Sequence, residues 1–301
     1  MKHVAVLMGG ISAEREVSLN TGTQVSGALR HAGFKVTEII VTEDLNALLA
    51  ALTPRPDVVF NALHGRFGED GTIQGVLDYI GLPYTHSGVR ASAVAMDKEA
   101  AKAVFAAAGL PVAPHKVIDI ADLAKSDPMP RPFVVKPVSE GSSVGVHIIK
   151  QGDNRCAEII KDWHFGQAMV EPYIPGRELT VGVLEDRALT VTEILSTEQF
   201  YDYHAKYAQG GSRHVLPAQI PDTVTQAAKT IAVAAHKALG CRGASRADFR
   251  YDDETDRLIL LEVNTQPGMT ATSLLPEQAA LAGIDFPSLC AWLVERAACR
   301  A

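Results

Sequence analysis

The segment Ser245–Thr270 has the sequence SRADFRYDDETDRLILLEVNTQPGMT, and it decides the fold of the surrounding chain. On both sides of the polar run Asp252–Asp256, apolar and polar residues alternate, which is typical of strands with one buried face. We therefore expect a hairpin in which Asp248 lies opposite Glu262 and a five-residue loop joins the strands. In this register the partners on the apolar face are Ala247 with Val263, Phe249 with Leu261 and Tyr251 with Ile259.

The same register gathers the polar side chains Arg246, Asp248, Glu262 and Asn264 on the opposite face. Two carboxylates and an amide oxygen form a set of hard oxygen ligands, which suits Mg²⁺ beside a substrate phosphate. The alternative is a solvated strand face with a surface ion pair between Arg246 and one of the carboxylates. The turn that follows favours the metal site, because Gly268 offers an unblocked backbone N–H as an oxyanion donor.

Composition and charge are those of a soluble globular protein. The chain has 301 residues, enough for about two domains or three small ones, and 47% of them are hydrophobic. A net charge of −7 and the lack of a basic tract argue against a nucleic-acid partner. No apolar run is long enough to span a membrane, and the N-terminus reaches its glycines too early for a signal peptide. The four cysteines lack CxxC spacing, so we expect reduced thiols in a cytoplasmic protein.

The N-terminal part of the chain alternates expected strands with expected helices, which favours a parallel, doubly wound sheet. Gly9 and Gly10 follow the first strand without the GxGxxG spacing of a dinucleotide site, so we assign no NAD. The turn-rich stretch 81–91 is an expected domain boundary. The expected strands are 3–8, 34–41 and 58–63, and the expected helices are 17–32, 45–52 and 72–80.

The rest of the chain has shorter elements and one long irregular segment. Residues 197–217 show little periodicity, and a loop of that length is usually functional or disordered. Besides the hairpin, the expected strands are 133–136, 144–149, 168–172, 178–184 and 188–194. The expected helices are 96–108, 154–163, 223–239 and 286–299, with a short helical piece at 120–125.

A glycine-rich loop and two lysines are candidates for binding phosphate. The loop SEGSSVG, Ser139–Gly145, lies between two expected strands, and its backbone N–H groups and serine hydroxyls can surround an anion. Lys136, at the end of the preceding strand, and Lys98, at the start of a helix, would supply cations. The alternative for the loop is a plain hairpin turn, and the alternative for Lys98 is a solvated lysine on a helix. The chain has no Walker A motif, so a nucleotide site must be of another type.

Four further residues are candidate ligand contacts. Glu171 and Glu178 lie on a strand and turn that could offer backbone groups to an adenine and a carboxylate to a ribose, although a plain edge strand fits as well. Glu14 opens the first helix at the carboxyl end of the first strand, where open sheets bind ligands. It could hold a substrate ammonium, or it could only stabilise the helix through a favourable interaction with the helix dipole. His64, after the third strand, could contact the same substrate or be structural.

Together these motifs resemble the D-alanine–D-alanine ligases of the ATP-grasp superfamily. The resemblance implies an N-terminal domain with a doubly wound parallel sheet and two α+β domains that clamp ATP between their sheets. We place these domains at residues 1–92, 93–184 and 185–301, with the phosphate loop in the second and the lid loop and metal-binding hairpin in the third. The matching segments span nearly the whole chain, and they are GGISAEREVSL, ALHGRFGEDG, MDK, VVKPVSEGSSVGV, YDYHAKY, SRADF and LLEVNTQPGMT.

The resemblance also implies residues for ATP and for two Mg²⁺ ions, for which Mn²⁺ can substitute. Glu171 and Glu178 are the implied adenine and ribose contacts. The implied phosphate ligands are Lys98, Lys136, Ser143 and Lys206. The implied metal ligands are Asp248, Glu262 and Asn264, the last of which also belongs to the nucleotide site.

For the amino-acid substrates, the resemblance implies that Glu14, with His64 nearby, holds the ammonium of the first D-alanine. Ser273 and Leu274 match the site for the second D-alanine. Arg246 and the Gly268 N–H match the oxyanion donors. The last implied group is a hydrogen-bonded triad that locks the 197–217 segment as a lid, and its members are Glu14, Ser142 and Tyr207.

Two positions depart from the pattern of the family. His204 stands in YDYHAKY where a glutamate is usual, and Ser245 precedes Arg246 where a glycine is usual. The first departure concerns the packing of the lid, and the second leaves Arg246 and Asp248 in place.

The function implied is ATP-dependent ligation of two D-alanines through an acyl phosphate, for peptidoglycan precursor synthesis, by a cytoplasmic homodimer. A related D-alanine–D-lactate ligase is one alternative, and Tyr207 beside Lys206 argues against it. A non-catalytic nucleotide-binding regulator is another, and the full set Asp248, Glu262 and Asn264 argues against that.

Overall fold

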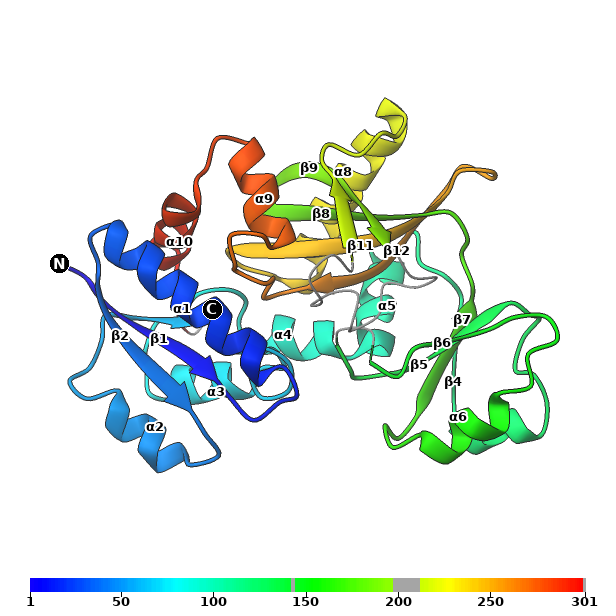
Figure 1. The fold of residues 1–301 in the computed structure, drawn as a ribbon, viewed down its shortest axis with the longest axis horizontal. Coiled ribbons are helices and arrows are strands. Elements are labelled where there is room, and N and C mark those ends of the chain that lie inside the picture. Colours follow the sequence, from blue (N-terminus) through cyan, green and yellow to red (C-terminus); the bar gives the residue numbers. More distant parts are fainter. Residues whose placement is uncertain (142–143, 197–211, 300–301) are drawn as a thin grey trace.

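The computed structural model describes residues 1–141, 144–196 and 212–299, and within these ranges the strands form three sheets (Figure 1). The first sheet has the order β2-β1-β3, and both pairings are parallel. The elements of this N-terminal unit are β1 (His3–Gly9), α1 (Arg15–His31), β2 (Lys35–Val41), α2 (Leu45–Ala51), β3 (Val58–Asn61) and α3 (Thr72–Tyr79).

Alternation along β1 shows that helices cover both faces of this sheet. Val4 and Val6 pack against α1 and against α10 (Phe286–Glu295), which returns from the end of the chain. Ala5 and Leu7 point the other way and pack against α2 and α3. The expected doubly wound parallel sheet is therefore confirmed.

The central sheet is antiparallel and has the order β4-β7-β5-β6. Phe133, Val135 and Val170 form its core with Ile159 of the helix that covers it. The elements of this unit are β4 (Lys116–Ile118), the 3₁₀ helix Ile120–Ala124, β5 (Phe133–Pro137), β6 (His147–Ile149), α6 (Cys156–Asp162) and β7 (Ala168–Pro172).

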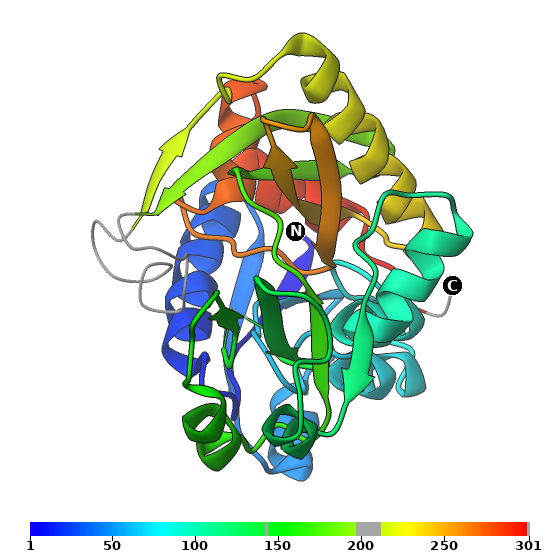
Figure 2. The same ribbon diagram turned by 90° about the vertical axis from the view of Figure 1, so that its right-hand side faces the viewer.

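The third sheet is also antiparallel and has the order β10-β9-β8-β11-β12. Helix α8 covers one face, as Figure 2 shows, and packs Ala228, Ala232 and Ala235 against the strands. Helix α9 (Leu274–Leu281) reaches the sheet through Gln278, whose side chain accepts from the N–H of Gly182 at 2.6 Å. The other elements are β8 (Arg177–Leu184), β9 (Arg187–Ser196), β10 (Ser212–Val215), α8 (Asp222–Leu239), β11 (Ala244–Asp252) and β12 (Arg257–Asn264).

The hairpin of β11 and β12 confirms part of the expected register and corrects the rest. Asp248 pairs with Glu262 and Ala247 with Val263, as expected. A β-bulge then follows, so Phe249 pairs with Leu260 and not with Leu261.

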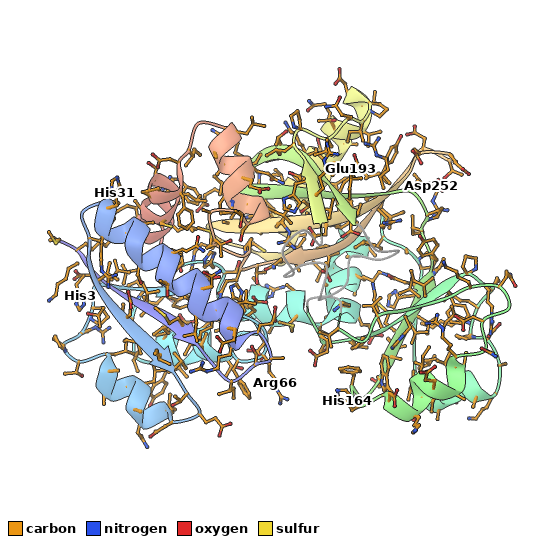
Figure 3. The ribbon with its side chains drawn as sticks, in the orientation of Figure 1. His3, His31, Arg66, His164, Glu193 and Asp252 are labelled. Carbon is orange, nitrogen blue, oxygen red and sulfur yellow. The ribbon has the colours of Figure 1, made fainter. Side chains whose placement is uncertain are left out.

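The bulge inserts one residue into β12 and exchanges the two leucines between the faces of the hairpin. Leu260 joins the core beneath α8, whereas Leu261 lies on the other face. The expected pairing of Tyr251 with Ile259 is therefore wrong, since Tyr251 pairs with Leu258. The loop is Asp253–Asp256, shorter than expected, because Asp252 pairs with Arg257; Figure 3 labels Asp252 near this tip.

Several other boundaries differ from those expected. The helix expected at 96–108 is two helices, α4 (Val89–Met96) and α5 (Lys98–Ala107), because Asp97 has an extended backbone and caps α5 through the N–H of Ala100. The strand expected at 144–149 is only β6. Strand β4 and helix α9 had no expected counterpart, and β10 lies within the segment expected to be irregular.

The sheets bear on the domain limits, which stay a proposal. Strand β8 is hydrogen-bonded to β9 and β11, so the expected limit at residue 184 would separate it from its own sheet. We propose instead that the central domain ends before Arg177. The chain finally returns to the N-terminal unit, where Tyr84 and Ala298 exchange both backbone hydrogen bonds.

All four cysteines are free thiols, at positions 156, 241, 290 and 299. Among the described residues, no helix has the length and apolar character needed to cross a bilayer.

Candidate active site

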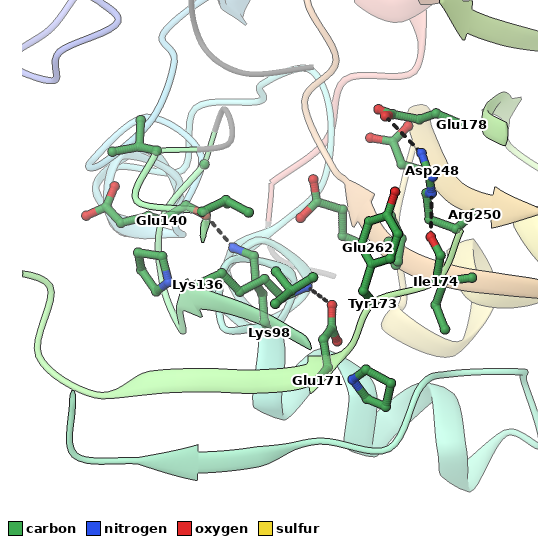
Figure 4. Close-up of a pocket in the computed structure, with 17 residues that line it drawn as sticks. Lys98, Lys136, Glu140, Glu171, Tyr173, Ile174, Glu178, Asp248, Arg250 and Glu262 are labelled. Atoms are coloured by element: carbon green, nitrogen blue, oxygen red, sulfur yellow. Dashed lines mark hydrogen bonds and ion pairs between the residues drawn. The ribbon is translucent and has the colours of Figure 1, made fainter. Parts of the chain in front are cut away.

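A pocket lies between the central sheet and the C-terminal sheet, and Figure 4 shows its lining. Six residues singled out from the sequence line it together. One comes from α5, two come from the central sheet and three come from strands of the C-terminal sheet, and they are Lys98, Lys136, Glu171, Glu178, Asp248 and Glu262. The pocket thus brings the phosphate candidates of one sheet to the metal candidates of the other.

The two lysines of the pocket are almost completely buried. Lys98 is the first residue of α5, and its ammonium donates to the backbone carbonyl of Glu140 in the phosphate loop. Burial lowers the pKa of Lys98, and the carboxylate of Glu262 partly offsets this effect. Lys136 lies on β5, and its ammonium is paired with the carboxylate of Glu171.

Glu171 on β7 has two cationic partners. One carboxylate oxygen pairs with Lys136, and the other pairs with Lys102, one turn after Lys98 on α5. Burial raises the pKa of Glu171, but Lys136 and Lys102 outweigh burial and hold it at about 2. Because both oxygens already have partners, Glu171 is an anion fixed by two hydrogen-bonded cations.

Asp248 and Glu262 are directly opposite each other on β11 and β12. Arg246 donates to both oxygens of Asp248, at 2.9 and 2.8 Å, and the Thr180 hydroxyl donates at 2.5 Å. Asn264 uses its side-chain oxygen to accept from the backbone N–H of Gln266 at 2.8 Å. Asn264 and Arg246 do not line the pocket itself.

The chemistry of this set fits a divalent cation. Within the described ranges no three or more His, Cys, Asp or Glu side chains gather as a metal group. Asp248 and Glu262 nevertheless face the same pocket as two lysines, and Mg²⁺ typically binds one or two carboxylates and takes its other ligands from phosphate and water. The bulge beside this pair also puts Leu261 into the lining.

The far end of the pocket is formed by β8 and the 173–176 turn. Arg250 donates to the carbonyls of Ile174 and Gly176, at 3.1 and 2.7 Å, and lies 3.8 Å from Glu178. Its guanidinium also lies 5.9 Å from the centre of the Tyr173 ring. Arg250 thereby ties β11 to the turn, so the backbone of that turn has a fixed position.

Glu14 and His64 lie outside this pocket, next to the loop that precedes α3. A Cβ atom placed on Gly65 would be 2.7 Å from a carboxylate oxygen of Glu14, and one on Gly141 would be 3.9 Å from the same atom. The Glu14 carboxylate therefore extends from the start of α1 toward Gly65 and toward Gly141 of the phosphate loop. Gly65 has φ +68°, so a side chain there is disfavoured twice.

His64 is buried and has a partner on each ring nitrogen. Nδ1 lies 2.9 Å from Glu69 and Nε2 lies 3.0 Å from the Thr21 hydroxyl. Burial lowers the pKa of His64, but Glu69 and the charge of Glu14 reverse this, so the pKa is raised. Two hydrogen-bond partners thus fix the orientation of His64, and its ring interacts electrostatically with Glu14.

The turn after β12 holds the remaining candidates. Ser273 precedes α9, and its hydroxyl lies 3.1 Å from the Thr270 N–H and 2.7 Å from the Thr270 hydroxyl. A Cβ on Gly268 would lie 3.2 Å from that same Ser273 oxygen, so the two are neighbours. Leu274 is the first residue of α9 and is buried.

Four expected site residues lie outside the described ranges, namely Ser142, Ser143, Lys206 and Tyr207. The implied triad of Glu14, Ser142 and Tyr207 therefore stays a prediction.

Sequence reasoning missed two buried polar residues beside the site. Lys102 is not among the candidates above, although its spacing of four from Lys98 places both on one face of α5. Gln266 looked like part of a turn, but its amide donates to the Leu63 carbonyl and accepts from Asn61 at 2.8 Å. It therefore joins the end of the β11–β12 hairpin to the end of β3.

Comparison with known proteins gives one consistent answer. The family model described as "D-ala D-ala ligase C-terminus" matches residues 104–295, and "D-ala D-ala ligase N-terminus" matches residues 46–87. The chain is 71% identical to a D-alanine–D-alanine ligase of Acidiphilium cryptum over 301 residues, with 100% of both proteins covered. It is 66% identical to one of Granulibacter bethesdensis, covering 100% of this chain and 99% of the relative.

Solved structures agree with these matches. The D-alanine–D-alanine ligase of Bacillus anthracis superposes with a TM-score of 0.85 at 31% identity, covering 98% of this chain and 97% of that one. The same enzyme complexed with ATP gives a TM-score of 0.82 at 30% identity, covering 98% and 96%. The ATP-grasp fold expected from the sequence is thereby confirmed.

Proposed function

This chain belongs to the D-alanine–D-alanine ligase family, and from that premise we propose how its own residues divide the work of the reaction. The enzyme joins two D-alanines in an ATP-dependent ligation that serves peptidoglycan precursor synthesis. The observation that carries the proposal is the meeting of Lys98 and Lys136 with Asp248 and Glu262 in one pocket between two sheets.

We assign the pocket to ATP. The 173–176 turn, whose backbone Arg250 fixes, receives the adenine together with Glu171, and Glu178 accepts from the ribose. Lys98 and Lys136 bind phosphate oxygens, since Lys98 donates to Glu140 of the phosphate loop and Lys136 lies at the end of the strand that leads into it. Ser143 and Lys206 complete this set in the proposal.

Asp248, Glu262 and Asn264 would hold two Mg²⁺ ions, which Mn²⁺ can replace. When bound, the ions supply positive charge to the phosphate oxygens of the nucleotide. The chain's own part is to orient the ligands. Arg246 and Thr180 fix the Asp248 carboxylate from two directions. The Gln266 N–H fixes the side-chain oxygen of Asn264.

We assign the first D-alanine to Glu14, whose carboxylate binds the ammonium with His64 nearby. Ser273 and Leu274 receive the carboxylate of the second D-alanine, where Ser273 and the start of α9 offer donors. Gly268 lies beside Ser273, so the two assigned functions, oxyanion donor and carboxylate site, are adjacent.

The chemistry follows from these positions. A carboxylate is a poor acylating agent, so the first D-alanine is phosphorylated by ATP to an acyl phosphate, and the amine of the second then displaces phosphate. Positioning and charge neutralisation by Lys98 and Lys136 carry the first step. Arg246 and the Gly268 N–H stabilise the oxyanion of the second step, an effect of roughly 3–4 kcal/mol per well-placed donor. Tyr207 and Ser142 latch a lid that keeps water from the acyl phosphate.

We further propose that the enzyme is a cytoplasmic homodimer without nucleic-acid or membrane partners. The net charge of −7 supports the absence of a nucleic-acid partner.

The test is product analysis. The protein is incubated with ATP, Mg²⁺ and D-alanine, alone or together with L-alanine or D-lactate, and the products are identified by mass spectrometry while ADP is quantified. We expect D-alanyl-D-alanine and stoichiometric ADP with D-alanine alone. ADP release that is independent of D-alanine, or a depsipeptide as the main product, would contradict the proposal.

A further inference from the structure

Glu171 is a buried carboxylate with a separate lysine on each oxygen. Lys102 pairs with Oε2, and Lys136 pairs with Oε1. The side chain of Lys102 is 2% exposed, that of Glu171 is 5% exposed and that of Lys136 is 11% exposed. Two cations for one anion are more than charge balance requires, so the second lysine needs an explanation.

The two lysines differ in their access to the nucleotide. Lys136 and Glu171 line the pocket, and Figure 4 shows both there with Lys98. Lys102 is not part of that lining and reaches Glu171 from the buried face of α5. A ligand in the pocket can therefore take Lys136 away from Glu171, whereas Lys102 stays where it is.

Phosphate binding competes with this pairing for the same ammonium. Lys136 must give a hydrogen bond to a phosphate oxygen, and its present partner is Glu171. If Lys136 were the sole partner, its departure would leave a buried carboxylate unpaired, which is strongly unfavourable. With Lys102 on the other oxygen, Glu171 keeps a cation throughout. The low pKa of Glu171, about 2 in spite of burial, agrees with this double pairing.

We propose that Lys102 is a positioning residue for nucleotide binding: it is the permanent partner of Glu171 and thereby releases Lys136 to the phosphates of the nucleotide. Lys102 does not line the pocket, so it acts through Glu171. The inference rests on the proposed function in one respect, namely that a nucleotide occupies the pocket. We expect Lys102 to affect the part of the nucleotide affinity that comes from the phosphates, and not the part that comes from adenine and ribose.

The test compares the binding of ADP and of adenosine to the full-length protein by competition. Lys102→Met removes the charge and keeps most of the volume. We expect the affinity for ADP to fall about tenfold or more, because Lys136 is then held by Glu171, while the affinity for adenosine changes by about twofold at most. An equal loss for both ligands would make Lys102 a merely structural residue and overturn the proposal.

A double-mutant cycle tests the mechanism itself. In a Glu171→Gln background Lys136 is not held by a carboxylate, so adding Lys102→Met should leave the affinity for ADP within about twofold. The same loss in both backgrounds would mean that Lys102 acts on the phosphates directly, which would overturn the proposal. If Lys102→Met alone does not fold, Lys102→Gln, which also lacks the charge, takes its place in both backgrounds of the cycle.

Two controls accompany the cycle. Lys102→Arg keeps the charge and should retain most of the ADP affinity. Lys125→Met removes a lysine whose side chain is 76% exposed and pairs with Asp122 in the same unit, and it should behave like the parent. The parent is also assayed for dipeptide synthesis. A parent that binds ADP but makes no dipeptide would refute the proposed function and leave the inference about Lys102 standing.

Discussion

Asp248 has a position that leaves it little freedom, since Arg246 and Thr180 donate to it together. We expect Asp248→Asn to keep the hairpin and lose one charged metal ligand. Turnover should fall by about two orders of magnitude or more, because the charge that holds the cation to the phosphates is reduced. The measurement is D-alanine-dependent ADP release against Mg²⁺ concentration. Asp253→Asn, in the exposed loop of the same hairpin, is the control, and normal turnover of Asp248→Asn would remove the residue from the metal site.

Glu14 is the second residue with a charge-specific prediction. Its carboxylate lies against Gly65 and Gly141, so Glu14→Gln keeps the shape and removes only the charge. The KM for D-alanine should rise about tenfold or more through loss of a charged hydrogen bond, while ADP binding stays unchanged. Glu16→Gln is the control, because Glu16 lies in the first turn of the same helix and its side chain is 85% exposed. Equal losses of D-alanine and ADP binding would indicate a structural role instead.

The departure at Ser245 has a local explanation. The Ser245 hydroxyl lies 2.7 Å from Nδ1 of His236 on α8, and both residues are buried. The serine thus gives a buried histidine a hydrogen-bond partner that glycine would not provide. Burial, with the charge of Lys237 added, lowers the pKa of His236 to about 4.

This histidine makes stability depend on pH. Between pH 6.5 and about 4 the unfolded chain binds a proton at His236 and the folded protein does not, so the free energy of unfolding falls as the pH falls. His236 accounts for a loss of about 3 kcal/mol in the free energy of unfolding when the pH reaches 4. Denaturant unfolding at several pH values measures this effect. In His236→Gln the free energy of unfolding should depend less steeply on pH across this range, and the same pH dependence as in the parent would refute the assignment. The control is His31→Gln, because His31 is exposed. Burial lowers the pKa of His86 to about 3, so His86 retains part of the pH dependence of the unfolding free energy in every variant.

At the scale of elements, the sequence predicted the type of most strands and helices, because alternation and helical spacing are local signals. It could not predict the bulge in β12. Leu260 and Leu261 are equally apolar, so the choice of which one enters the core depends on the packing of α8 and on the pocket. Helix α9 was missed for a similar reason: its buried residues include Pro276 and Gln278, which do not look like a core face.

The phosphate loop gives a prediction about an element. Gly145 has φ +69°, and a Cβ there would lie 2.7 Å from the Phe165 ring and 2.9 Å from Pro137. Gly145→Ala should displace the loop and raise the KM for ATP about tenfold, since phosphate donors lose their positions. Gly152 is a matched control, because it has φ +75° but nothing within 4 Å of its Cβ position.

Steady-state kinetics and thermal unfolding separate the two effects. Gly152→Ala should cost about 1 kcal/mol of stability from its backbone conformation and leave the KM for ATP unchanged. If Gly145→Ala behaves in the same way, the contact with Phe165 does not position the loop.

At the scale of the whole molecule, the site is assembled from all three units, and this is where the sequence alone was weakest. The residues of each motif could be recognised, but the pairs Lys102–Glu171 and Asn61–Gln266 join segments far apart in the chain. No local pattern indicates such partners. The resemblance to a family indicated that these motifs belong to one site. The pairing of β8 with β11 then showed that β8 belongs to the C-terminal sheet.

The link through Gln266 gives the last prediction. Gln266 is 2% exposed, and its amide joins Leu63 and Asn61 of the N-terminal unit to the turn that leads to Gly268. Gln266→Leu leaves buried polar groups without partners, so we expect a loss of about 2–4 kcal/mol in the free energy of unfolding. The KM for D-alanine should also rise more than the KM for ATP, because the turn carries the assigned D-alanine contacts and does not line the nucleotide pocket.

The control for this variant joins the same two units at the surface. Gln24 on α1 accepts from the Ala271 N–H at 2.8 Å in an exposed position. Gln24→Ala should change stability by about 0.5 kcal/mol and leave both KM values near those of the parent, because water can replace the lost bond. Denaturant unfolding and initial rates at varied D-alanine and ATP measure both effects. If the two variants have equal effects, or if Gln266→Leu raises the KM for ATP as much as that for D-alanine, the buried link does not position the D-alanine contacts. A selective rise in the KM for D-alanine would instead mean that the N-terminal unit sets the position of the turn through a single buried amide.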